Sequence, residues 1–150
     1  MLTIYVDADA CPVKDEVYVV ATRYGVPVAL VANAPMHVPD GFRVEMVVVA
    51  EGPDAADDWI AERAGEGDVV VTADIPLAAR CLAAGAAVLG TNGRPFTEDS
   101  IGGALASRDL KSQLREAGIH SGGPRPLSAK DSSRFLSRLD EAISRSLRER

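Results

Sequence analysis

The sequence predicts an α/β fold, a three-layer domain with a parallel sheet of about five strands and helices on both faces. Short apolar, β-branched segments alternate with longer helix-like segments along the chain, which is typical of a parallel sheet covered by helices. Two of the apolar segments end in an acid and are followed by a proline, as at a strand-to-helix junction. The 150 residues, 47% hydrophobic and 25% charged, indicate one globular domain.

Five segments have the composition of strands. They span residues 2–6, 26–31, 42–49, 68–72 and 86–89. The valines of 69–71 form an uninterrupted β-branched run, which predicts a strand buried on both faces. Asp68, before this run, is expected to be a turn residue.

Five further segments are helix-like, at residues 13–24, about 54–64, 76–84, 97–117 and 128–150. Gly25 and Gly65 end the first two, and residues 118–127 form a loop rich in Gly and Pro. The last segment is amphipathic, with an apolar stripe of Phe135, Leu136, Leu139, Ile143 and Leu147. We therefore expect a single domain over residues 1–150, with a basic helical C-terminal segment from about residue 108.

Charge is unevenly distributed along the chain. The net charge is −6, but residues 1–107 carry −10 and residues 108–150 carry +4. An acidic body with a basic tail fits a metal site beside an anion-binding arm, while a mixed-charge helix can equally be a solvated surface. No apolar run approaches the 18 residues that span a bilayer and no basic leader is present, so we expect a cytoplasmic protein without membrane association. Cys11 and Cys81 match no zinc spacing and are expected to be free thiols.

Acids follow two of the predicted strands. Asp7 and Asp9 follow the first strand, and Asp74 follows the strand at 68–72. Ligands of open α/β sheets bind outside the carboxyl ends of the strands, so these side chains are expected at the usual active-site crevice. Carboxylates gathered there repel each other unless a cation joins them, and Mg²⁺ or Mn²⁺ prefers such oxygen ligands. The alternative is that each acid only caps the following helix.

Further acids open the helix at 54–64. Acids in a first turn complement the helix dipole, and Asp54 with Asp57 can form a capping pair, so one of them needs no function. Asp57 precedes Ile60 by three residues, and Ile60 and Ala64 are expected to face the core. This spacing predicts that Asp57 lies on the sheet-facing side of the helix start, near the strand ends.

These motifs resemble a known family. The pattern Asp57-x-x-Ile60-Ala61-x-x-Ala64, followed by Val71-Thr72-Ala73-Asp74, is similar to the second half of a PIN-type nuclease domain. The chain more closely resembles the YaiI/YqxD family of uncharacterised bacterial proteins, which is regarded as PIN-like. The segments that carry this resemblance are residues 6–13, 52–58, 72–78, 114–118 and 122–127, with Asp131 and Phe135.

The resemblance implies a PIN-like domain that hydrolyses phosphodiester bonds of RNA or single-stranded nucleic acid with Mg²⁺ or Mn²⁺. Its implied catalytic residues are Asp7, Asp57 and Asp74, and its metal ligands are these three with Asp9 and Asp58. PIN nucleases usually add an acid near residue 40 and another just after the Thr-x-Asp motif, where this chain has Ile75, Pro76 and Leu77. Asp40 and Glu45 lie in the first region, and Asp9, Asp58 or Glu16 are alternatives for completing the site.

Substrate-binding residues are expected around this edge. Asn33 and Asn92 each follow a predicted strand, where they can bind a phosphate or cap a turn. Arg125 and Lys130, in the basic tail, are expected to contact the nucleic-acid backbone.

Two other functions are compatible with the same residues. In a haloacid dehalogenase-like phosphatase, Asp7 would be the nucleophile and Asp9 the acid/base, although Cys11 stands where that family has Thr or Val. The third is a non-catalytic nucleic-acid-binding module.

Overall fold

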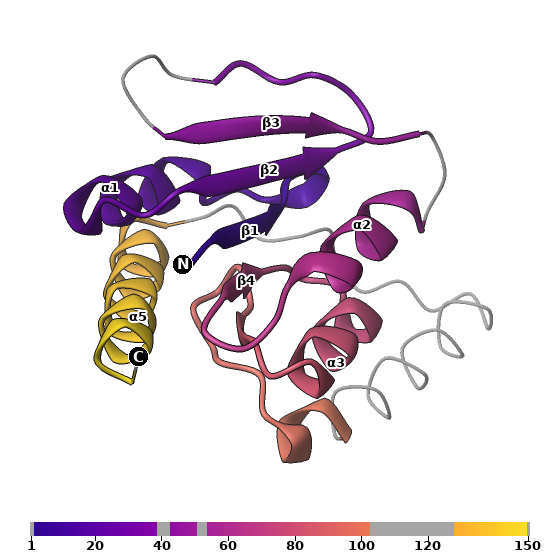
Figure 1. The fold of residues 1–150 in the computed structure, drawn as a ribbon. Coiled ribbons are helices and arrows are strands. Elements are labelled where there is room, and N and C mark those ends of the chain that lie inside the picture. The colour runs from indigo at the N-terminus through magenta and orange to yellow at the C-terminus, as the bar shows by residue number, and fades with distance from the viewer. Residues whose placement is uncertain (1, 39–42, 51–53, 103–127, 150) are drawn as a thin grey trace, which may run out of the picture.

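The computed structural model describes residues 2–38, 43–50, 54–102 and 128–149 (Figure 1). Five parallel strands form one sheet in the order β3-β2-β1-β4-β5. Their bounds are β1 Ile4–Asp7, β2 Val28–Ala32, β3 Val44–Val48, β4 Val69–Val71 and β5 Ala87–Leu89. The predicted parallel sheet of about five strands is confirmed.

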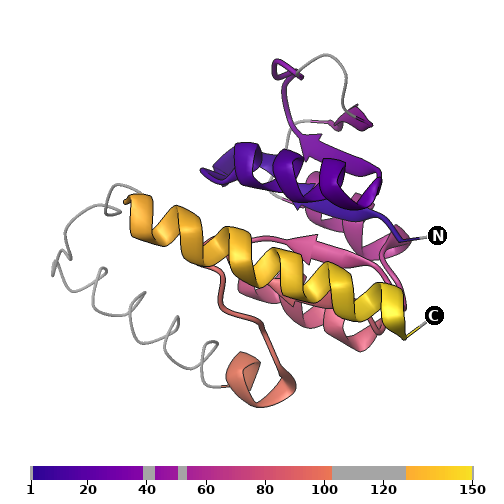
Figure 2. The same ribbon diagram turned by 90° about the vertical axis from the view of Figure 1, so that its left-hand side faces the viewer.

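Helices cover both faces of the sheet, which confirms the predicted three layers. Their bounds are α1 Lys14–Tyr24, α2 Ala55–Arg63, α3 Ile75–Ala83 and α5 Ala129–Arg148, and residues 98–102 are also helical. Helices α1 and α5 lie side by side on one face, and α2 and α3 lie on the other (Figures 1 and 2). All residues of β2 and β4 are buried, because both faces of these strands are covered.

Strand β1 sends its side chains alternately to the two layers. Ile4 and Val6 belong to the core under α1 and α5, whereas Tyr5 packs on the side of α2 and α3. Because side chains alternate along a strand, Asp7 projects to the same side as Tyr5. The chemistry of β1 therefore lies on the α2 side of the sheet.

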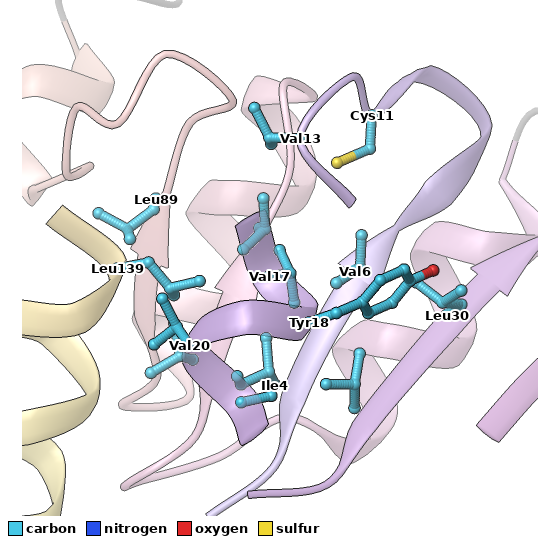
Figure 3. Packing of buried hydrophobic residues seen from close by; sticks show 14 of the residues in the cluster. Ile4, Val6, Cys11, Val13, Val17, Tyr18, Val20, Leu30, Leu89 and Leu139 are labelled. Carbon is cyan, nitrogen blue, oxygen red and sulfur yellow. The ribbon is translucent and has the colours of Figure 1, made fainter. Parts of the chain in front are cut away.

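The core on the other face joins the two ends of the chain. Figure 3 shows Val17 and Val20 of α1 packed against strand residues and against Leu139 of α5. Phe135, Leu139 and Ile143 are fully buried, as their stripe predicted. Leu147 departs from this prediction, because 39% of it is exposed in the last turn of α5.

Most predicted helix boundaries agree with the structure to within two residues. Gly25 ends α1 with φ +65°, a conformation that glycine adopts without strain. Ser128 starts α5 through a capping box with Asp131. Asp68 is the expected turn residue, and its carboxylate accepts hydrogen bonds from the backbone nitrogens of Thr3 and Gly65.

The structure adds one turn to the predicted elements, and two of the predicted segments fall largely outside the described residues. A 3₁₀ turn that the sequence did not predict, η1 Ala8–Ala10, follows β1, and α1 begins at Lys14, one residue after its predicted start. The expected helix 97–117 and loop 118–127 lie mostly or wholly outside the described residues. Among the described helices, none combines the length and the apolar character that crossing a bilayer requires.

Candidate functional site at the carboxyl edge of the sheet

The sheet reverses its direction of winding between β1 and β4. From β1 the chain continues to β2 and β3 on one side, and β4 and β5 lie on the other. In open parallel sheets such a switch point opens a crevice at the carboxyl ends of the strands, where ligands bind. Asp7 is the last residue of β1, and Asp74 lies three residues beyond the end of β4. Both acids are therefore at the edge that the fold provides for a ligand.

A buried threonine connects these two acids. The Oγ1 hydroxyl of Thr72 donates a hydrogen bond to Oδ2 of Asp7 at 3.0 Å and accepts one from the backbone nitrogen of Asp74 at 2.9 Å. Thr72 is fully buried, and it is the one buried polar side chain in the part of the chain described. A buried hydroxyl with both donor and acceptor functions satisfied holds its partners in place. Sequence reasoning noted Thr72 only as part of a motif and missed this role, although its position at the end of an apolar run was a signal.

Asp74 also caps helix α3. Its Oδ1 atom accepts a hydrogen bond of 2.9 Å from the backbone nitrogen of Leu77, and proline occupies the first turn. A side-chain cap is therefore observed for Asp74 but not for Asp7 or Asp9, because Val13 is the N-cap residue of α1 and η1 has no side-chain cap. The cap does not remove Asp74 from the edge, because it orients the carboxylate at the start of α3.

Asp57 brings a third carboxylate from the first turn of α2. Burial raises the pKa of Asp57 to about 6, and the negative charges of Asp74 and Asp7 add to this shift, while Arg80 partly opposes it. Burial also raises the pKa of Asp7; the hydrogen bond from Thr72 opposes that rise, and Asp74 and Asp9 reinforce it. The structure thus places Asp57 within electrostatic range of Asp7 and Asp74, in a setting that disfavours the charged forms of Asp7 and Asp57.

A cation bound at this edge would stabilise the ionised forms of Asp7 and Asp57. Within the described residues, no group of three or more His, Cys, Asp or Glu side chains is arranged so as to hold a metal ion. Mg²⁺ commonly binds one or two carboxylates and completes its shell with waters and substrate phosphate oxygens. The carboxylates at this edge are oxygen donors that repel each other, and they fit this mode of binding.

Asp9 lies in the turn after β1, where its charge also acts on Asp7. Its carboxylate is exposed and accepts the backbone N–H of Asn33, with N–O distances of 3.1 and 3.3 Å. The amide nitrogen of Asn33 in turn donates to the carbonyl of Ala50 at 3.0 Å. These bonds join the segments that follow β1, β2 and β3, so both residues lie at the carboxyl edge and contribute to its shape.

Other residues considered for the site have different partners. Asp58 pairs with Arg80 at 2.8 Å, and Glu16 accepts a 2.5 Å hydrogen bond from Ser132 of α5. Glu45 lies in the first half of β3, paired in register with Ala29, and so is distant from the carboxyl edge.

The remaining predicted substrate-binding residues lie in a turn or on the surface, or outside the described residues. Asn92 accepts a hydrogen bond from the backbone nitrogen of Arg94 within a turn, and Lys130 is exposed at the start of α5. Arg125 and Asp40 lie outside the described residues.

The fold and this edge define an α/β protein with acidic side chains at the switch point of a parallel sheet. The chain belongs to the YaiI/YqxD family, described as uncharacterized, whose family model matches residues 5–145. It is 58% identical over 144 residues to a UPF0178 protein of Nitrobacter winogradskyi, covering 96% of this chain and 92% of that protein. It is 59% identical over 144 residues to a UPF0178 protein of Azorhizobium caulinodans, covering 96% and 91% of the two chains. No solved structure matches the chain.

The raised pKa of Asp57 predicts a pH-dependent stability. An acid with a pKa near 3.8 when unfolded and about 6 when folded binds its proton more tightly in the folded state, so its contribution is lost as the pH rises from about 4 to 6. Asp57→Asn should therefore unfold at a higher temperature than the parent at pH 7.5 in a chelator. We expect a gain of about 1 kcal/mol, allowing for solvent screening, that disappears near pH 4.

Thermal unfolding at both pH values measures this difference. Glu62→Gln removes an exposed carboxylate from the same helix and should show no comparable gain at pH 7.5. A parent chain that is more stable than Asp57→Asn at pH 7.5 in chelator would contradict the crowding of acids at this edge.

Proposed function

We propose that this protein is a divalent-metal-dependent nuclease that hydrolyses phosphodiester bonds in RNA or single-stranded nucleic acid. The observation that carries the proposal is the electrostatic coupling of Asp57 to Asp7 and Asp74 beside the switch point, with the pKa values of Asp7 and Asp57 raised. Charged groups placed against each other at this cost are typical of functional sites. Hydrolysis of a phosphodiester suits them, because it requires a cation near the phosphate and no covalent intermediate.

The residues at the carboxyl edge would have two roles, binding the metal ion and orienting its ligands. Asp7 and Asp57, with Asp74, would hold Mg²⁺ or Mn²⁺, which when bound lowers the pKa of water and neutralises charge on the phosphate. Thr72 would keep the Asp7 carboxylate in one orientation through its 3.0 Å hydrogen bond. Asp74 would be positioned by its cap on α3. The roles of Asp9 and Asp58 as further ligands stay predictions, since their carboxylates are engaged by Asn33 and Arg80.

Incubation with a fluorescently labelled single-stranded RNA tests the proposal. We expect cleavage with Mg²⁺ or Mn²⁺, no cleavage in EDTA, and recovery when Mn²⁺ is added in excess of the chelator. The physical reason is that the carboxylates alone repel the scissile phosphate, so this phosphate enters the acidic edge only when their charge is compensated.

Each alternative function gives a different result. Release of phosphate from an aryl phosphate, with a trapped phospho-aspartate at Asp7, would indicate a phosphatase. Binding of RNA without cleavage under all metal conditions would indicate a binding module. Cleavage that persists undiminished in EDTA would contradict a metal-dependent mechanism.

A further inference from the structure

A groove lies on the α2 side of the sheet, mainly along the amino ends of β1, β2 and β3, and Tyr5 is the lining residue of β1 that is nearest to the acidic carboxyl edge. It has a volume of about 510 Å³, and Tyr5, Trp59, Arg43 and Glu45 are among the residues that line it. Tyr5 lies on β1 two residues before Asp7 and projects to the same side, so about 6.6 Å of strand separates the two positions. The groove is large enough for a nucleotide-sized ligand, since small-molecule sites have about 300–1,000 Å³. It therefore extends the candidate site along the sheet.

Two aromatic side chains form one wall of this groove. The rings of Tyr5 and Trp59 pack edge to face, with centroids 6.1 Å apart and an interplanar angle of 61°. The guanidinium carbon of Arg63 lies 4.0 Å from the centroid of the Trp59 ring, and the Arg63 side chain is largely accessible to solvent. Aromatic rings combined with an arginine plane are the surfaces on which unpaired nucleobases stack.

The charges around the groove favour binding of the base of a nucleotide over binding of its phosphate. Arg43 and Glu45 line the groove with opposite charges. The positive charge of Arg63 beside the indole ring is offset by the negative charge of Asp68, which also acts on Tyr5. These charges give no net attraction for a phosphate. The exposed carboxylate of Glu45 can accept a hydrogen bond from an exocyclic amino group, as acids do with cytosine N4. A neutral, flat ring with amino donors thus matches the groove better than a phosphate does.

We propose that this groove binds an unpaired base of a single-stranded nucleic acid whose backbone continues to the acidic edge. This inference rests on the proposed nuclease function and names its substrate class. Duplexes are excluded, because their bases are paired and stacked inside the helix and cannot reach Tyr5 and Trp59.

Trp59 is the only tryptophan of the chain, so its fluorescence reports directly on the groove. We would titrate the full chain in EDTA, which prevents metal-dependent cleavage, with a short oligoadenylate RNA. Saturable quenching or a spectral shift is expected with the single strand, and little change with the same strand annealed to its complement. Binding of the single strand without any change in Trp59 fluorescence, or an equal change with the duplex, would overturn the proposal. An absence of binding would overturn it as well.

A matched pair of variants tests the aromatic wall by anisotropy of labelled RNA. Trp59→Leu should weaken binding by roughly 5- to 150-fold, the usual effect of losing one base-stacking ring. Tyr24→Leu removes a ring from α1, on the opposite face of the sheet, and should bind as the parent does. Equal affinities of folded Trp59→Leu and the parent would contradict the proposal, and the parent's fluorescence decides the question if Trp59→Leu does not fold.

The test of base binding and the test of nuclease activity can give different results. Quenching of Trp59 by single strands without cleavage in Mn²⁺ would leave the groove in place and remove the nuclease function. Cleavage in Mn²⁺ without quenching would do the reverse.

Discussion

Asp7→Asn is expected to lower metal-dependent cleavage of single-stranded RNA by roughly 10²-fold or more, the loss typical of removing one electrostatic group from an active site. Asparagine keeps the shape of the side chain, and its amide oxygen can still accept the hydrogen bond from Thr72. It removes the negative charge that a divalent cation requires. The variant should remain folded, because Asp7 is a carboxylate whose charged form is disfavoured by burial and by neighbouring acids. Cleavage rates in Mn²⁺, with circular dichroism as the check on folding, measure the effect.

Asp15→Asn is the matched control for this experiment. It makes the same chemical change at an exposed carboxylate in the first turn of α1 and should leave the cleavage rate close to that of the parent. A folded Asp7→Asn chain with undiminished activity would show that Asp7 has no part in the reaction. Comparable losses in both variants would point to an effect of net charge instead.

Phe135→Ala is expected to have the largest effect on stability, about 3–5 kcal/mol lost from the free energy of unfolding. Phe135 is fully buried in the core that α5 shares with α1 and the sheet. The backbone of α5 at this residue is also closely packed, since a Cβ atom at Gly93 would lie 3.1 Å from the Cα atom of Phe135. The cavity left by the ring cannot collapse easily in such surroundings. A loss of this size is a large part of the 5–15 kcal/mol that stabilises a typical domain.

Urea denaturation of Phe135→Ala beside Leu147→Ala provides the comparison. Leu147 belongs to the same helix, but it is 39% exposed, so its truncation should cost much less than that of Phe135. Similar costs for the two variants would mean that α5 does not dock through the Phe135 face.

The sequence predicted which faces of the strands and helices are buried between the layers of this fold. The valine run of β4 indicated a strand with both faces covered, and the structure buries all three residues. The spacing of Phe135, Leu139 and Ile143 identified the face of α5 that contacts the core. Both patterns are local, because burial imposes a period of two or of 3.6 residues on an element wherever it docks.

One element that the sequence did not predict, the 3₁₀ turn η1, depends on short-range hydrogen bonding. The backbone nitrogen of Cys11 bonds to the carbonyl of Ala8, which closes the 3₁₀ turn η1 after β1. This turn carries Asp9, whose carboxylate accepts the backbone N–H of Asn33 after β2. Competing turns of this kind differ little in energy, and periodicity alone does not distinguish them.

The sequence by itself determined that acids follow β1 and β4 and open α2, because each motif is contained in a few consecutive residues. Only the tertiary structure decided which of them share an environment. Asp57 and Asp58 are neighbours in sequence, yet a helix rotates successive residues by about 100°, so Asp57 interacts with Asp7 and Asp74 while Asp58 pairs with Arg80. The raised pKa of Asp57 depends on strand order and on the docking of α2 against α3, which are set by long-range packing. Burial and repulsion between charges from separate elements are properties of the assembled fold, and no local pattern encodes them.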